Sequence, residues 1–256
     1  MPEISVIIVS THHRDQIHCI PALKNQEYSN YEIIISNKDG ISKARNDGIQ
    51  RAEADKLIFL DDDAYPQPGY LELAVELLND HPIVAGRVIH PDNDFFMIVA
   101  NDHAYDQGDE PKMTNDIIGC NMLFQRDVFD NIGTFDEKIT WGHDETLFIE
   151  RAQHQYDIFY HPDLAVEHRF ENSIIDWWRK QIQYGPADVY KSKVTGEPLF
   201  SGWYEIVPIS SGDSFAEITF RSVRKDIRNI ARLAALLRGV PDPPENMYRS
   251  NSEESK

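Results

Sequence analysis

The stretch Leu57–Asp63, with the sequence LIFLDDD, decides the fold because a short apolar run ends directly in three carboxylates. An apolar run of this length predicts a buried strand. Adjacent carboxylates raise one another's pKa, and a divalent cation among them reverses that effect. Carboxylate oxygens suit magnesium, manganese or calcium. Ligands of open α/β sheets bind just beyond the carboxyl ends of strands, so this stretch predicts a metal-bound phosphate there.

The residues around this stretch alternate between two apolar periodicities. Runs rich in β-branched residues predict strands at 4–9, 31–36 and 57–60. Helical periodicity predicts helices at 17–23, 42–54 and 68–79. We expect Ser42 to cap the second helix and Pro68 to stand in the first turn of the third. This alternation predicts a parallel sheet with helices on both faces.

The remainder of the chain predicts a less regular α/β arrangement. Further strands are expected at 83–90, 95–100, 117–125, 157–160 and 165–168. Further helices are expected at 126–132, 145–155, 174–190 and 216–240. The polar stretch 101–115 is expected to form a loop over a site, and the tail 241–256 to be disordered.

Charge and composition exclude several classes of protein. The 256 residues carry a net charge of −18, with 43 acidic and 25 basic residues, which argues against nucleic acid as a partner. A salt-loving source fits this acidic surface, as in halophile proteins. Cys19 and Cys120 favour buried thiols over a disulfide. We find no apolar run near the roughly 18 residues that span a bilayer and no secretory signal, so we expect a cytoplasmic protein.

Several segments, taken in order, resemble family 2 glycosyltransferases with the GT-A fold. They are ISVIIVST at 4–11, KARNDGI at 43–49, FLDDD at 59–63, the stretch 119–137 ending in GTFDE, WGHDE at 141–145, and 162–168. The resemblance covers residues 4 to 170 and implies an α/β GT-A domain over 1–240. Its parts would be a Rossmann-like parallel nucleotide-sugar-binding half at 1–100, a mixed-sheet acceptor half at 101–190 and C-terminal helices at 191–240.

The resemblance implies a divalent metal site, holding Mn²⁺ or Mg²⁺, at the acidic triplet. Asp63 would be a direct ligand, with Asp61 as a second ligand or, like Asp62, a contact to the ribose or the metal's waters. His168 would complete the metal site or contact the diphosphate, although a lone histidine is often structural. An ordinary acidic loop is the alternative for the triplet. A calcium loop is disfavoured because Pro66 stands where glycine is needed.

The resemblance also places a catalytic base at Asp144, in the WGHDE segment. This chain has His143 where the family usually has glutamate, so the register is open by one residue and Glu145 is the second candidate. A helix cap is the alternative role for Asp144. Trp141 would form an aromatic wall for a sugar ring, or simply pack in a core.

The nucleotide pocket is less well defined by the resemblance. Relatives carry an aspartate after the second strand that reads the base, and here either Asn37 or Asp39 could take that role. Further candidates for contacts to base, ribose or phosphate are Thr11, Arg45 and Asn46, and Arg45 could instead form a surface ion pair. Two residues are expected to border the donor sugar, Gly119 and Asn121.

The segment 216–240 differs from the acidic remainder of the chain. It contains six basic and two acidic residues, and its apolar residues recur at helical spacing. One hypothesis is an interfacial helix that binds anionic lipid on the cytoplasmic membrane face and meets a lipid-linked acceptor. The other is a helix that packs on the acidic body of its own domain.

Together these features predict a metal-dependent, inverting glycosyltransferase that moves one sugar from a nucleotide diphosphate sugar, UDP- or GDP-linked, to a glycan or lipid-linked acceptor. A processive polymerase is disfavoured because the Gln-x-x-Arg-Trp motif of such synthases is absent. A catalytically silent sugar-binding protein is one alternative, based on His143. A nucleotidyltransferase is another, but residues 10–14 lack the glycine-rich loop that it needs.

Overall fold

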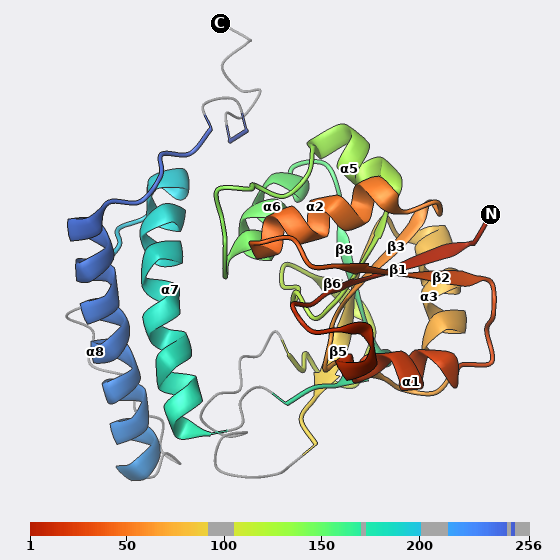
Figure 1. The fold of residues 1–256 in the computed structure, drawn as a ribbon, viewed down its shortest axis with the longest axis horizontal. Coiled ribbons are helices and arrows are strands. Elements are labelled where there is room, and N and C mark those ends of the chain that lie inside the picture. The colour runs from red at the N-terminus through yellow and green to blue at the C-terminus, as the bar shows by residue number, and fades with distance from the viewer. Residues whose placement is uncertain (92–104, 170–172, 201–214, 245–246, 249–256) are drawn as a thin grey trace, which may run out of the picture. The chain divides into compact units, whose positions relative to one another are not determined.

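The computed structural model describes residues 1–91, 105–169, 173–200, 215–244 and 247–248. The chain divides into two compact units (Figure 1). The sheet unit comprises Met1–Thr140 and Asp144–Phe170, and the helical unit comprises Trp141–His143 and Glu171–Lys256. The strand expected at 95–100 lies outside the described residues, as does most of the tail beyond residue 244.

The first half of the sheet unit is parallel, as the alternation of periodicities predicts. Strand β1 (Ile4–Val9) pairs in parallel with β2 (Tyr31–Ser36) on one side and with β3 (Lys56–Asp61) on the other. The connections contain the 3₁₀ turn η1 (Arg14–Gln16) and the helices α1 (Cys19–Lys24) and α2 (Ile41–Arg51). All three strands therefore end at the same edge of the sheet.

The second half makes the sheet mixed, which confirms the predicted fold class. The strand order is β2-β1-β3-β7-β5-β8-β4, with β6 beside β8. Strand β7 (Asn121–Gln125) runs antiparallel to both β3 and β5 (Ile83–Ile89). Strand β8 (Ile158–Glu167) is parallel to β5, and the short strands β4 (Tyr65–Pro66) and β6 (Lys112–Thr114) pair antiparallel with it.

Helices cover both faces of this sheet (Figure 1). Successive side chains of β1 alternate between two apolar clusters, so Val6 and Ile8 join one cluster and Ile7 joins the other. The first cluster contains residues of α1 and α3 (Tyr70–Asp80). The second contains residues of α2, α5 (Arg126–Ile132) and α6 (Asp144–Ala152), with Phe59 and Phe124 among its aromatic rings.

Two expected helix starts are wrong, for a backbone reason. Gly40 precedes α2 with φ of 97°, and Ser42 lies buried inside the helix rather than capping it. Gly69 precedes α3 in the left-handed conformation, so Pro68 stands before the helix. Glycine adopts positive φ without strain, and in both places it directly precedes the first residue of the helix.

Two expectations for the later strands are also corrected. The strands expected at 157–160 and 165–168 form one strand, β8, whose register against β5 shifts between Gly86 and Arg87. Because the register shifts, the side chains of this strand do not alternate regularly along its whole length, and the sequence pattern therefore predicts two separate strands. The loop expected over 101–115 contains β6, which is only three residues long.

The helical unit is built on a pair of helices, α7 (Ile174–Thr195) and α8 (Phe215–Arg238), which lie side by side (Figure 1). Ser173 caps α7 by accepting a hydrogen bond from the Asp176 amide at 3.2 Å. A Cβ atom on Gly185 would stand 2.6 Å from the Ala231 backbone, so glycine lets the helices approach closely. Among the described helices, none is both long and apolar enough to cross a membrane.

Candidate active site

The acidic triplet lies where the parallel strands end. Asp61 closes β3, and the Asp62 carboxylate accepts a hydrogen bond from the Ser10 hydroxyl and lies 3.0 Å from His12 Nδ1. Ser10 and His12 follow β1, which is the parallel neighbour of β3. The carboxyl ends of the two strands thus meet, and Asp62 is tied to the β1 side of the cluster.

Asp61 and Asp63 face a histidine from the far end of the chain. His168 Nε2 lies 3.1 Å from Asp63 Oδ1 and 3.9 Å from Asp61 Oδ2. The sheet brings His168 to the triplet, because β4 directly follows the triplet and pairs with the end of β8. In this pairing, Tyr65 lies opposite Glu167. The His168 amide also donates to the Ile89 carbonyl at 2.9 Å, which holds the residue beside β5.

A thiol joins this cluster, which sequence reasoning missed. Asp61, Cys120 and His168 each place a ligand atom within 4.8 Å of the others. Burial, followed by the charges of Asp61 and Asp63, raises the pKa of the Cys120 thiol well above its usual range. A protonated thiol is a poor ligand for a hard cation, whereas carboxylates and imidazole suit Mn²⁺. The donor set of Asp61, Asp63 and His168 therefore fits Mn²⁺ or Mg²⁺.

Arg45 lies at the centre of a second charged cluster. Its guanidinium is buried, donates to the Asp144 carboxylate and to the Gly119 carbonyl at 3.2 Å, and lies 3.7 Å from Glu145 Oε2. Burial lowers the pKa of Arg45, but the charges of Asp144, Glu145 and Asp61 outweigh it and leave that pKa raised. Arg45 thus forms a buried ion pair and not the surface pair that we weighed as an alternative.

Gly119 makes room for this arginine. A Cβ atom at Gly119 would collide with the Arg45 guanidinium. The next residue is Cys120, whose thiol lies beside Asp61 and His168, so the short segment 119–120 touches both clusters. The aspartate triplet and the arginine cluster are therefore neighbours within the sheet unit.

The two carboxylates that begin α6 differ in environment. Asp144 is 1% exposed, and its Oδ1 makes no hydrogen bond to any residue that the structure describes. Burial and the charge of Asp144 raise the pKa of Glu145 to about 8, although Arg45 acts in the opposite direction. The Glu145 carboxyl group therefore keeps its proton to a higher pH than an ordinary glutamate does.

Two of the expected ligand residues have their side chains engaged inside the fold. The Asn46 amide bonds to the Phe135 amide and carbonyl at 3.0 and 2.9 Å, and so holds the GTFDE loop. The Asn121 side chain accepts from the Tyr70 hydroxyl at 2.7 Å and donates to two strand carbonyls. Both amides hold segments of the site in place.

The other expected ligand residues fall in two places. Thr11 follows β1, while Asn37 and Asp39 follow β2, and all three are exposed at the edge where the parallel strands end. Trp141 belongs to the helical unit, where its ring centroid lies 4.5 Å from that of Tyr184. The aromatic-wall role of Trp141 stays a prediction.

Comparison with known proteins agrees with this architecture. Residues 35–133 match the model of the glycosyl transferase family 2. A glucosyl-dolichyl phosphate glucuronosyltransferase from Haloferax volcanii is 28% identical over 109 residues, which cover 38% of this chain and only 34% of the relative. The structure of S. aureus TarS 1–349 is similar with a TM-score of 0.53 at 12% identity, over 93% of this chain and 92% of that one.

The mixed sheet and its similarity to TarS show that the chain has the GT-A fold of glycosyltransferases. Over residues 35–133 the chain is similar to family 2 glycosyltransferases, and it spans about a third of the length of its Haloferax volcanii relative. Enzymes of this family generally depend on a divalent metal.

Proposed function

We propose that this enzyme is a metal-dependent, inverting glycosyltransferase that moves a single sugar from a UDP- or GDP-sugar to a hydroxyl group or a lipid-linked acceptor. The observation that carries the proposal is the pair of adjacent clusters in the sheet unit. One contains Asp61, Asp63 and His168, and the other contains Arg45 with two carboxylates.

The first cluster would hold Mn²⁺ or Mg²⁺ through Asp61, Asp63 and His168. A bound divalent ion neutralises the diphosphate as it leaves the sugar. Asp62, fixed by Ser10 and His12, would orient the ribose or the metal's waters. The exposed residues Thr11, Asn37 and Asp39 would bind the nucleotide at the same sheet edge.

The second cluster would supply the base. In an inverting transfer, the acceptor oxygen attacks the face of the sugar opposite the leaving diphosphate, so one carboxylate that removes the hydroxyl proton is sufficient. Asp144 Oδ1 is a buried carboxylate oxygen that makes no hydrogen bond within the described residues, and a hydroxyl could donate to it. Glu145, with its raised pKa, would carry its own proton near neutral pH and leave removal of the hydroxyl proton to Asp144.

A lipid-linked acceptor is proposed from the relative in Haloferax volcanii, whose name includes a dolichyl phosphate. An acceptor of this kind is met at a membrane surface. Contact of residues 216–240 with the cytoplasmic membrane face would bring the enzyme to it, since this segment is basic while the chain is acidic.

The test is a thermal-shift screen of UDP- and GDP-sugars with and without Mn²⁺. We expect one donor to raise the Tm only when the metal is present. Asp63→Asn should lose this effect, and the exposed Asp130→Asn should keep it. Donor hydrolysis with Mn²⁺ then separates an enzyme from a silent binding protein. A donor shift that does not depend on metal in the wild-type enzyme would refute the metal-bound diphosphate.

A further inference from the structure

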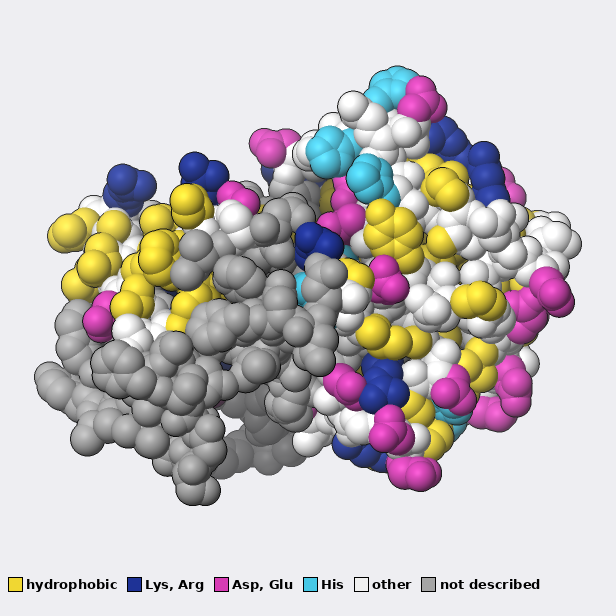
Figure 2. Space-filling view, turned by 90° about the horizontal axis from the view of Figure 1, so that it is seen from below, with side chains coloured by type: hydrophobic (Ala, Val, Ile, Leu, Met, Phe, Trp, Pro, Cys, Tyr) yellow, Lys and Arg dark blue, Asp and Glu magenta, His cyan; other side chains and the backbone are white. Residues whose placement is uncertain are grey.

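The helical unit carries an unusual concentration of exposed apolar side chains. Of the ten large hydrophobic residues exposed in the described parts of the chain, six lie on α7 and α8: Ile175, Ile182, Ile230, Leu233, Leu236 and Leu237. Leu237 is 90% exposed and Ile230 is 67% exposed. Hydrophobic side chains gather on this unit with Lys and Arg side chains at their margin (Figure 2). Contiguous apolar surface of this kind marks an interaction site.

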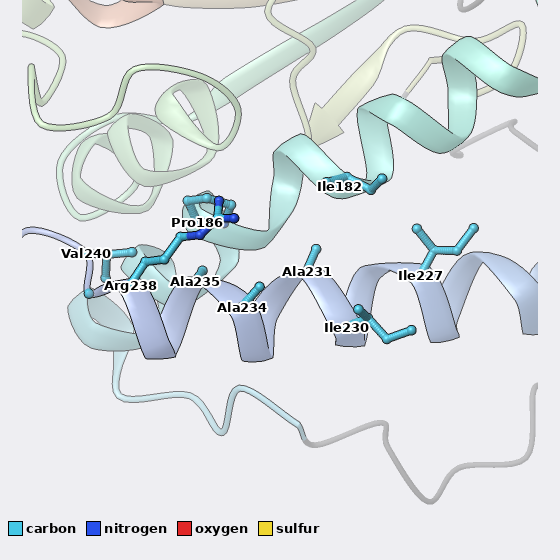
Figure 3. A pocket seen from close by; sticks show the side chains of 10 residues that line it. Ile182, Pro186, Ile227, Ile230, Ala231, Ala234, Ala235, Arg238 and Val240 are labelled. Atoms are coloured by element: carbon cyan, nitrogen blue, oxygen red, sulfur yellow. The ribbon is translucent and has the colours of Figure 1, made fainter.

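A groove runs between the two helices within this surface (Figure 3). It encloses about 440 Å³ and is lined by Ile182 and Pro186 of α7 and by Ile227, Ile230 and Ala234 of α8. The close approach of Gly185 to Ala231 brings the helices together, while the short alanine side chains leave space beside it. Arg238 lines the end of the groove near Pro186. The groove is thus apolar along its length with a cation at one end.

The charge of this unit is opposite to that of the whole chain. Helix α8 contains six basic and two acidic residues, and α7 contains four basic and two acidic, in a chain of net charge −18. Two of the arginines, Arg228 and Arg232, bind Asp188. Others, such as Arg179 and Arg238, are exposed. An anionic partner is therefore favoured at this surface and disfavoured over most of the chain.

We propose that the α7–α8 surface binds an anionic lipid bilayer, with Ile230 and Leu237 entering the boundary between headgroups and acyl chains and a lipid chain occupying the groove. Apolar residues flanked by cations are the combination by which interfacial helices bind membranes. A symmetric dimer through this surface would place two basic helix pairs against each other. A small apolar ligand would fill the groove but leave the outer leucines in water.

Lipid binding at this surface rests on the proposed function, because it identifies the surface at which the protein would meet a lipid-linked acceptor. Binding to vesicles is measured without a sugar donor. Failure of this inference therefore leaves the transfer reaction standing, and failure of donor binding leaves the lipid surface standing.

The experiment is co-sedimentation of the full chain with phosphatidylcholine vesicles, with and without about a third of phosphatidylserine, at about 0.15 M salt. We expect binding to the anionic vesicles and at least tenfold weaker binding of the double variant Ile230→Glu with Leu237→Glu. Arg238→Gln should weaken binding by about fivefold, since a basic residue near an anionic surface contributes about 1 kcal/mol. Met113→Glu, at an exposed apolar position of the sheet unit, is the matched control and should bind normally.

Circular dichroism of each variant checks that the fold is intact, which we expect because the changed side chains are exposed. Equal binding of the wild type and the double variant would overturn the proposal. So would an absence of wild-type binding to anionic vesicles, or a wild-type dimer in light scattering that the double variant abolishes, because a second copy would then occupy the surface.

Discussion

Each unit of this protein contains a buried aspartate bound to arginine, and the two aspartates differ in how many of their oxygens have hydrogen-bond partners. In the helical unit, Asp188 Oδ1 lies 2.7 Å from His143 Nε2 and 2.6 Å from Arg228, and Oδ2 accepts from Arg228 at 2.6 Å and from Arg232 at 2.7 Å. In the sheet unit, Asp144 binds Arg45 through one oxygen, and its other oxygen has no partner among the described residues.

The electrostatic consequences of the two sites are opposite. Burial alone would raise the pKa of Asp188, but hydrogen bonds from Arg228 and His143 outweigh it and lower that pKa strongly. Around Asp144, one arginine serves two carboxylates, and the pKa of Glu145 is raised. A carboxylate whose two oxygens both accept hydrogen bonds, such as Asp188, stabilises the fold. A carboxylate with one oxygen lacking a partner among the described residues, such as Asp144, can still accept a hydrogen bond from a substrate. This contrast explains why we place chemistry at Asp144 and a structural role at Asp188.

The largest effect is expected for Asp144→Asn, which removes the proposed base. Transfer should fall by about 10²–10⁴-fold, the usual contribution of a positioned general base. Donor binding should persist, because the metal cluster is unchanged. The fold should also persist, since Glu145 can ionise and balance Arg45 at 3.7 Å. Single-turnover kinetics and donor binding by thermal shift measure both quantities.

Glu145→Gln is the companion variant that decides the register. Near-normal transfer by Asp144→Asn combined with loss in Glu145→Gln would move the base to Glu145. Near-normal transfer by both variants would contradict any role of this pair in proton removal.

Asp188→Asn should instead act on stability. Its partners are two arginines and a histidine, so the substitution leaves two partly buried arginines without their carboxylate. Breaking a fully buried pair costs about 3–5 kcal/mol in the free energy of unfolding, and the loss here should lie at or below the lower end of that range because the arginines are partly exposed. Urea unfolding followed by tryptophan fluorescence reports the helical unit through Trp177 and Trp178 of α7. Exposed Asp130→Asn is the control, and an equal midpoint for wild type and Asp188→Asn would show that the network contributes little.

Gly119→Ala should have a smaller effect on activity. The added methyl group would collide with the Arg45 guanidinium and shift it from the carboxylate pair. A loss of about tenfold in kcat is expected, because misplacing a catalytic group by a fraction of a bond length is costly. Steady-state kinetics at saturating donor measure it. Wild-type kcat in this variant would mean that the position of Arg45 does not matter for transfer.

Much of the sheet unit follows from local sequence patterns. The parallel strands and the acidic triplet were predicted because apolar periodicity and charge are properties of neighbouring residues. The Asp63–His168 contact was expected only through resemblance, since it depends on the pairing of β4 with the end of β8. Cys120 was missed because its place beside Asp61 depends on the register of β7 against β3, where Leu60 faces Asn121.

Residue type alone did not separate ligand contacts from structural ones. Asn46 and Asn121 were expected at the donor sugar or nucleotide, yet their buried amides hold the GTFDE loop and two strands. A buried asparagine satisfies backbone groups as well as it satisfies a ligand. The Asp188 site was missed for a related reason, because His143 lies 45 residues away in sequence. The i, i+4 spacing of Arg228 and Arg232 was the only available signal.

The smallest expected effects concern how the stability of the fold depends on pH at Glu145 and Asp188. The folded pKa of Glu145, about 8, lies above its ordinary value of 4.5, so its contribution to stability is complete below about pH 4.5 and is lost as pH rises through 8. The folded pKa of Asp188 is lowered, so its contribution is present above the ordinary pKa of 3.8 and is lost as pH falls below it. Glu145→Gln should therefore flatten the alkaline limb of the stability profile, and Asp188→Asn the acidic limb.

Urea midpoints measured from pH 3 to pH 9 for the wild type and both variants test this pair of signs. The two variants are matched, since each replaces a carboxylate by its amide. If Glu145→Gln left the alkaline limb unchanged, Glu145 would be ionised at neutral pH in the folded protein, and the raised pKa of Glu145 would have to be abandoned. A flattened limb would instead mean that burial beside Asp144 keeps Glu145 protonated near neutral pH in the folded protein.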